Sequence, residues 1–369
     1  MKHVKIIPHT TPKNEGIDNE FIENFHHFSQ KIIKELLIEN KNYIFSPLSL
    51  YYALTMLSEG TVGKSHEELN SLLITNNSLI RESLQRIYLN NYYSNEYGAV
   101  KLANSMWIRE GYNINKSFSN VLKEYYFSDV FTTLFDNEGK KEIVKWINDQ
   151  TLNLLDIRID SLPYSDKTIA ALINTVYFDN KWKHDFLKED IYKDLFDNKT
   201  IVEYLNHSID TYYINNEKYE AIFDFYENEN KIKFIKPKDG YTVEELLEEN
   251  IFDNSDKKKV KCYISIPKFE VSSNYDLIEP LKKLGVNSVF TNQVSNIIDG
   301  FDCKVNSIMQ VAKIIVNEKG TKVAAMTNVE IALTCLLQET LEFKLDKPFI
   351  YIIYDRNNIP LFVGKIKSL

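Results

Sequence analysis

The sequence predicts an α+β fold in a single domain of 369 residues. Apolar residues at helical spacing dominate the first half of the chain, and short β-rich runs dominate from Lys261 onward. Because helices and strands are segregated along the chain, an α+β arrangement is favoured over a strictly alternating one. No repeat of about 20–50 residues is visible, and no linker rich in glycine, serine or proline divides the chain. One domain covering residues 1–369 is therefore expected.

Three segments have the pattern of amphipathic helices. Residues 21–40 place apolar side chains every three or four positions. A second helix is predicted to begin at Pro47, because proline is favoured in the first turn, and to end at Gly60. A third is predicted over residues 142–155.

Six segments have the composition of strands, with β-branched and aromatic residues in short runs. They cover residues 100–108, 173–178, 260–266, 311–316, 349–354 and 361–366. The mixed-charge stretch 253–261 is expected to be a solvated loop.

Composition and charge exclude several classes of protein. The chain is 44% hydrophobic and 26% charged, which is ordinary for a globular protein. It carries 44 Lys and Arg against 52 Asp and Glu, and this net charge of −8 disfavours a nucleic-acid partner. Its 11 glycines form neither a dinucleotide-binding fingerprint nor a phosphate-binding loop. No cofactor is expected.

Cysteine and histidine spacing gives no sign of a metal site. Cys262, Cys303 and Cys335 include no C-x-x-C pair, and the seven histidines include no H-E-x-x-H motif. Three free thiols are favoured, and one disulfide stays open.

The amino-terminal residues lack the pattern of a secretory signal. The first eight residues are charged and end at Pro8, whereas a signal needs an apolar core of about 7–15 residues. No apolar run reaches the roughly 18 residues of a membrane span. We expect no membrane insertion and either a cytoplasmic protein or one secreted by an unconventional route. A signal that precedes this sequence is the remaining alternative.

The stretch 321–334 alternates with period two, and one of its faces carries no charge. It also contains no proline, so it could occupy a central position in a sheet. From the residues alone, a permanently placed and half-buried strand is the favoured interpretation.

Seven motifs, in order and at family spacing, resemble those of the serpins. They are N-Y-I-F-S-P-L-S at 42–49, A-N-S-M-W at 103–107, W-I-N-D-Q-T at 146–151, I-N-T-V-Y-F at 173–178, P-K-F at 267–269, N-E-K-G-T at 317–321 and K-P-F at 347–349. Two departures stand out: Gln310 replaces the histidine found in many serpins, and residues 223–226 replace the usual L-P-Y.

This resemblance implies a serpin fold, with about nine helices around three β-sheets and an exposed reactive-centre loop near the carboxyl terminus. Residues 1–20 would form an amino-terminal extension, and residues 318–344 the hinge and loop. The stretch 321–334 then becomes a loop that inserts into the central sheet after a protease cuts it. The protein would be an irreversible suicide-substrate inhibitor and not an enzyme.

The resemblance also assigns roles to individual residues. In the hinge they are Glu318, Gly320, Thr321, Val323, Ala324 and Ala325. Around the opening and the centre of the main sheet, the breach and shutter, they are Lys268, Trp182, Asn174, Ser46, Ser49 and Gln310. We expect Glu318 to pair with Lys268.

The bond that the protease cuts is expected at Thr334–Cys335, because residues 318 to 334 make the seventeen positions that run from the hinge glutamate to the cut. Counting back from the K-P-F motif points instead to Leu337, and Leu333 and Leu336 are neighbouring alternatives. Since no Lys or Arg lies between Lys322 and Lys344, trypsin-like targets are disfavoured. Chymotrypsin-, elastase- or cathepsin G-type serine proteases are expected, with cysteine proteases as a second class.

Other partners are not expected. Residues 78–91, which correspond to the glycosaminoglycan-binding helix of some serpins, carry only Arg81 and Arg86 as basic residues, so heparin is not an expected cofactor. A monomer is expected. The alternative function is that of a non-inhibitory serpin, a chaperone or binding protein, and the uncharged face of 321–334 argues against it.

Overall fold

The computed structural model describes residues 9–10, 13–36, 41–74, 77–155, 157–165, 167–291, 294–320 and 341–369. These ranges contain eight α-helices and three short 3-10 helices. The α-helices are α1 (Asn19–Leu36), α2 (Pro47–Glu59), α3 (Gly63–Leu73), α4 (Asn77–Asn91), α5 (Lys116–Tyr125), α6 (Asn137–Gln150), α7 (Val243–Leu246) and α8 (Ile278–Lys283). The 3-10 helices are η1 (Ile159–Ser161), η2 (Lys188–Asp190) and η3 (Ser288–Phe290). No helix in these ranges combines the length and the apolarity needed to cross a membrane.

Seventeen strands fall within the same ranges. They are β1 (Tyr43–Phe45), β2 (Tyr93–Asn95), β3 (Gly98–Arg109), β4 (Asp129–Thr133), β5 (Ala170–Asn180), β6 (Tyr192–Phe196), β7 (Thr200–Asn215), β8 (Tyr219–Phe225), β9 (Lys231–Pro237), β10 (Lys258–Pro267), β11 (Phe269–Asp276), β12 (Val294–Ile298), β13 (Phe301–Cys303), β14 (Met309–Val316), β15 (Leu341–Lys344), β16 (Phe349–Tyr354) and β17 (Pro360–Ile366).

Six strands, β2 to β5 together with β11 and β14, form two separate hydrogen-bonded groups. In the first, β3 pairs with β2, β4 and β5, and its antiparallel ladder with β5 runs from Gly98↔Asn180 to Ile108↔Ala170. In the second, β11 pairs only with β14. Within the described ranges no ladder joins β5 to β14. The central sheet is therefore split between these two strands, and four sheets are found where the resemblance predicts three.

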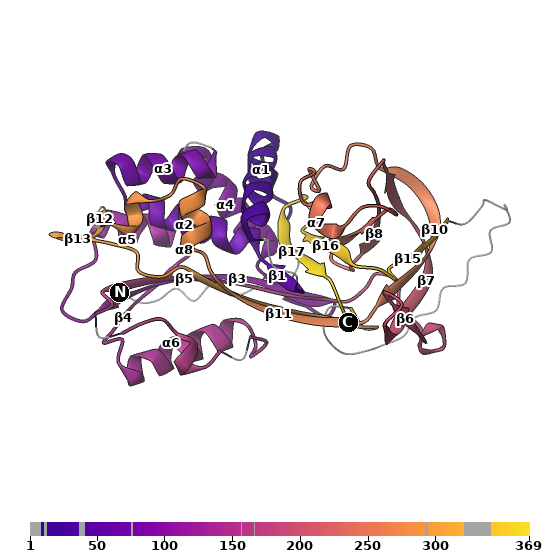
Figure 1. Cartoon of the computed structure of the whole chain (residues 1–369). Coiled ribbons are helices and arrows are strands. Elements are labelled where there is room, and N and C mark those ends of the chain that lie inside the picture. Colours follow the sequence, from indigo (N-terminus) through magenta and orange to yellow (C-terminus); the bar gives the residue numbers. More distant parts are fainter. Residues whose placement is uncertain are drawn as a thin grey trace.

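The remaining strands form a nine-stranded sheet and a hairpin. The sheet has the order β1-β17-β16-β9-β8-β7-β10-β15, with β6 also paired to β7, and β12 pairs with β13. Figure 1 shows most helices on one side of β3, β5 and β11, and α6 on the other side.

The helices form where the sequence supplies an apolar stripe and a cap. Phe21, Phe25 and Phe28 of α1 lie one above another on its buried face. Helix α2 begins because Ser46 accepts a hydrogen bond from the backbone N–H of Ser49, and Pro47 occupies the first turn. This helix packs against β5 and β17, so it lies behind the split in the central sheet.

Two sequence predictions need correction. Helix α6 spans Asn137–Gln150, not 142–155, because the side chain of Asp136 caps it at the backbone N–H of Gly139. Helix α1 spans Asn19–Leu36, and the last four residues of the predicted segment, 37–40, lie outside the described residues. Residues 258–261 belong to β10 and not to a loop, because β7 supplies backbone partners along that stretch.

Candidate functional site

The hinge after β14 lies against the end of β5. The backbones of Asn317 and Gly320 form an isolated antiparallel pair. Gly320 has a φ of +121°, and a Cβ atom there would lie 2.2 Å from the carbonyl oxygen of Asn180. Only glycine fits, because other residues avoid this φ and would collide with that oxygen. The chain that follows Gly320 therefore starts beside the last residue of β5.

Trp182, two residues after the end of β5, also contacts the hinge. Its indole N–H donates a hydrogen bond of 2.8 Å to the carbonyl oxygen of Asn317. The ring is 1% exposed and stacks on Tyr226, with ring centroids 4.6 Å apart. A buried indole needs a hydrogen-bond acceptor, and here the acceptor is hinge backbone.

The predicted ion pair between Glu318 and Lys268 is confirmed, and a second carboxylate joins it. The Nζ atom of Lys268 lies 2.9 Å from Glu318 and 3.0 Å from Glu203. The hydrogen bond from Lys268 holds the pKa of Glu318 below its ordinary value. Partial burial lowers the pKa of Lys268, but hydrogen bonds to the two glutamates outweigh it, so this pKa is raised. The hinge therefore starts at a charged cluster that ties β14 to β11 and β7.

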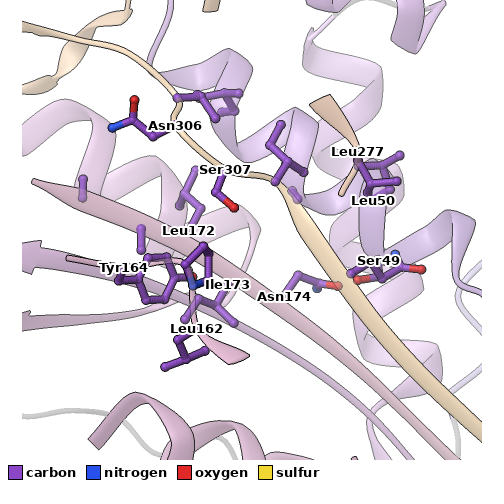
Figure 2. A pocket seen from close by; sticks show the side chains of 18 of the residues that line it. Ser49, Leu50, Leu162, Tyr164, Leu172, Ile173, Asn174, Leu277, Asn306 and Ser307 are labelled. Carbon is purple, nitrogen blue, oxygen red and sulfur yellow. The ribbon is translucent and has the colours of Figure 1, made fainter. Parts of the chain in front are cut away.

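A cavity of about 550 Å³ occupies the split between β5 and β14. Figure 2 shows Leu172, Ile173 and Asn174 of β5 on one side, and Asn306 and Ser307, which lead into β14, on the other. Residues of α2 line it from one face of the sheet, and residues 161–164 line it from the other. We call this cavity the slot.

The β14 wall of the slot is tied to the start of α2. The side chain of Gln310 accepts a hydrogen bond of 2.7 Å from the backbone N–H of Ser46, and its Nε2 atom donates one of 2.9 Å to the carbonyl oxygen of the same residue. The Ser46 hydroxyl donates in turn to the carbonyl oxygen of Leu361 in β17. Glutamine thus serves as a two-point anchor at the position where many serpins carry a histidine.

The β5 wall is held by a different network. The Asn174 side chain donates a hydrogen bond of 2.6 Å to Asn104 of β3, which donates to the carbonyl oxygen of Tyr126. The Tyr126 hydroxyl bonds Glu59, and Glu59 also pairs with Arg81 of α4. The Oδ1 atom of Asn174 has no hydrogen-bond partner among the described residues. The two walls are therefore anchored separately, β14 to α2 and β17, and β5 to β3.

The slot narrows toward the hinge. A second cavity between the same strands, lined by Val176, Phe178, Lys313 and Ile314, holds only about 10 Å³. Since Asn180 is the β5 residue that Gly320 contacts, the open end lies far from the hinge and the closed end beside it.

The described ranges include only part of the predicted site. They place Glu318 and Gly320 at the hinge, Lys268 and Trp182 beside it, and Asn174, Ser46, Ser49 and Gln310 along the slot. The other predicted hinge residues and the predicted cut lie outside the described residues: Thr321, Val323, Ala324, Ala325, Leu333, Thr334, Cys335, Leu336 and Leu337.

Two of the three cysteines can be placed. Cys262 is a buried free thiol in β10, and Cys303 is a partly buried free thiol that lines the slot. Burial raises the pKa of Cys262 to about 12, so it is not a nucleophile at neutral pH. Among the described residues no group of His, Cys, Asp or Glu has the arrangement of a metal site.

Sequence reasoning missed three contributors to the site. Glu203 shares Lys268, Tyr226 supports Trp182, and Asn104 anchors Asn174. Asn104 lies in the serpin-like motif A-N-S-M-W and Tyr226 in the segment that replaces L-P-Y, so the sequence carries a signal for both positions. Glu203 carried none, because its contact with Lys268 depends on the pairing of β7 with β10, which Lys268 directly follows.

A match to a known protein family identifies the family of this chain. The family described as Serpin (serine protease inhibitor) matches residues 23–369. The chain is a serpin. The serpin fold and the α+β class predicted from the motifs are thus confirmed.

Several relatives cover this serpin almost from end to end. An uncharacterized serpin-like protein of Thermococcus kodakarensis is 30% identical, over 96% of this chain and 87% of its own. Alpha-1-antiproteinase S of Cavia porcellus is 27% identical, over 95% of this chain and 91% of its own. The crystal structure of tengpin, a thermophilic serpin, in its native state has a TM-score of 0.87, 25% identity and 98% coverage of both chains. Protease inhibition is the general function that this family membership supports.

Proposed function

We propose that this serpin is an irreversible suicide-substrate inhibitor of serine proteases. The observation that carries the proposal is the slot between β5 and β14, which leaves a vacant strand position in the central sheet. Residues 321–333 form an alternating segment with one uncharged face, which suits a strand buried in a sheet. Gly320 sits beside Asn180 at the end of β5, so this segment could run antiparallel to β5 along the slot.

The proposed reaction begins as ordinary proteolysis. The catalytic serine of the protease attacks the bond at Thr334–Cys335 and forms an acyl-enzyme. Residues 321–333 then fill the slot and carry the bound protease toward its far end, where distortion of the protease prevents hydrolysis of the ester. The native state would persist because a kinetic barrier, and not an equilibrium, keeps the slot vacant.

The loop sequence supports chymotrypsin-, elastase- or cathepsin G-type targets. Neither Lys nor Arg occurs between Lys322 and Lys344, so a pocket with a buried carboxylate finds no cationic side chain. Leu333, Leu336 and Leu337 are the alternative positions for the cut, and cysteine proteases are a second class of target. Arg81 of α4 is already engaged with Glu59, which supports the proposal that no glycosaminoglycan is needed.

The proposal is tested by incubating the protein with chymotrypsin, elastase, cathepsin G and trypsin and then separating the mixture in SDS. We expect a stable covalent complex with at least one of the first three proteases and none with trypsin. Mass spectrometry of the released carboxyl-terminal fragment identifies the cut. Cleavage by chymotrypsin, elastase or cathepsin G without any SDS-stable complex would favour the alternative, a non-inhibitory serpin that acts as a chaperone or binding protein.

A further inference from the structure

The slot has the size and lining of a site for an apolar small molecule. Its volume of about 550 Å³ lies in the range of about 300–1,000 Å³ that ligand sites occupy. Leu50, Leu54 and Leu57 of α2 form one side, and Met106 and Leu172 contribute from β3 and β5. This lining favours a hydrocarbon chain, because burial of apolar surface is the main gain that such walls offer.

Two lysines line the same cavity at the end far from the hinge. Lys167 lies just before β5, and Lys304 lies between β13 and β14. Both are exposed, and within the described ranges neither forms an ion pair. Asp302 lines this end as well, so the two lysines leave one positive charge in excess. The cavity therefore combines apolar walls with a cationic rim at one end.

We propose that the slot binds a long-chain carboxylate, with its hydrocarbon chain along β5 and its carboxylate at Lys167 and Lys304. From Ala170 to Val176, six strand steps span roughly 20 Å, which suits an extended chain of about 12 to 16 carbons. The polar groups Ser49, Asn174 and Gln310 lie toward the hinge, at the opposite end from the lysines. One orientation is therefore favoured, because the reverse one would place the carboxylate beside the Gln310 anchor and away from both cations.

Such a ligand would compete with the reactive-centre loop. This consequence depends on the proposed function, since the loop must fill the same space to trap a protease. With the slot occupied, insertion is delayed while hydrolysis of the acyl-enzyme continues, so the protein is consumed as a substrate. The carboxylate would thus be a reversible antagonist of inhibition that leaves the cut itself unchanged.

Binding is tested first, by calorimetric titration of the full-length protein with dodecanoate and with dodecanol below their aggregation limits. The double variant Lys167→Gln/Lys304→Gln should bind dodecanoate about fivefold more weakly, the upper range for an exposed ion pair. Dodecanol should bind both proteins equally, because it shares the chain but not the charge. Lys259→Gln, an exposed lysine on β10, is the matched control and should bind dodecanoate like the unaltered protein. An unaltered protein that does not bind dodecanoate, or a double variant that binds it equally well, would overturn the inference.

A second measurement separates failure of this site from failure of the proposed function. The loop is cut by limited proteolysis, and both the melting temperature and dodecanoate binding are measured. A higher melting temperature together with lost binding supports the slot as the site. A higher melting temperature with unchanged binding places the ligand elsewhere and overturns the inference. An unchanged melting temperature, with lysine-dependent binding intact, shows that the loop does not insert, so the site stands and the inhibitory mechanism fails.

Discussion

At the scale of single residues, Gly320 has the tightest steric constraint in the hinge. Its positive φ and its contact with the carbonyl oxygen of Asn180 both exclude a side chain. The motif N-E-K-G-T indicates a hinge here, but the collision itself depends on Asn180, which is 140 positions earlier in the sequence. The resemblance to the serpin hinge therefore predicts a glycine at this position, but the sequence does not reveal the contact that requires it.

Gly320→Ala should lower the melting temperature of the native protein and cost about 2–3 kcal/mol of stability, because backbone strain and a backbone collision add. Gly240→Ala is the matched control. Gly240 also has a positive φ, +92°, but a Cβ atom there would have nothing within 4 Å. Equal losses for the two variants in thermal melts would show that the contact with Asn180 contributes nothing.

Lys233 is a buried lysine that does not line the slot. It is 0% exposed, and its Nζ atom donates hydrogen bonds to the carbonyl oxygens of Ile251 and Asp253 and to the side chain of Asn254. Three acceptors favour the charged form, yet burial outweighs them and lowers the pKa of Lys233 to about 7, from an ordinary value of 10.5.

The protein should therefore gain stability as the pH rises from 7 to 9. Within this window the unfolded chain holds a proton on Lys233 that the folded chain has released, which gives at most about 1.4 kcal/mol per pH unit. Lys233→Met should remove this slope. Urea unfolding of both proteins at pH 7, 8 and 9 measures the difference, and parallel pH profiles would contradict the prediction.

At the scale of elements, the sequence predicts which strands exist better than how they pair. The runs at 100–108, 173–178 and 311–316 all lie inside observed strands, because alternation and β-branched residues report burial locally. The absence of a ladder between β5 and β14 could not be predicted, since two strands about 130 residues apart along the chain carry no local signal of whether they touch. The predicted start of α6 was wrong because its capping residue, Asp136, lies before the apolar residues on which the prediction depends.

Thr321→Arg should turn the inhibitor into a substrate. Thr321 would be the first inward-facing residue to enter the sheet, and burying an unpaired guanidinium costs several kcal/mol. Insertion then slows relative to hydrolysis of the acyl-enzyme, while the cut at Thr334–Cys335 stays the same. Cleavage and complex formation with chymotrypsin are followed together in SDS gels.

The matched control is Lys322→Arg, which places the same group one position later, on the outward face of the strand. It should form complexes like the unaltered protein. If Thr321→Arg trapped protease with the unaltered stoichiometry, the inward face would have to be reassigned by one residue.

At the scale of the whole molecule, the vacant slot predicts that a cut chain is more stable than an intact one. Filling the slot would bury the apolar side of 321–333 against α2 and join the two halves of the central sheet. Limited proteolysis within residues 333–337 should therefore raise the melting temperature by well over 10 °C. A passive loop would leave the melting temperature unchanged or lower, and calorimetry before and after cleavage distinguishes the two.

The indole of Trp182 gives this serpin a built-in optical probe of its own hinge. The chain has three tryptophans, and the other two, Trp107 and Trp146, belong to a separate apolar cluster around α6. Replacing both with phenylalanine would leave one emitter, hydrogen-bonded to the backbone of Asn317 and stacked on Tyr226. Movement of the residues after Asn317 into the sheet would change the surroundings of the Trp182 indole, and therefore its fluorescence. Stopped-flow fluorescence of unlabelled protein could then time insertion directly, against each protease in turn.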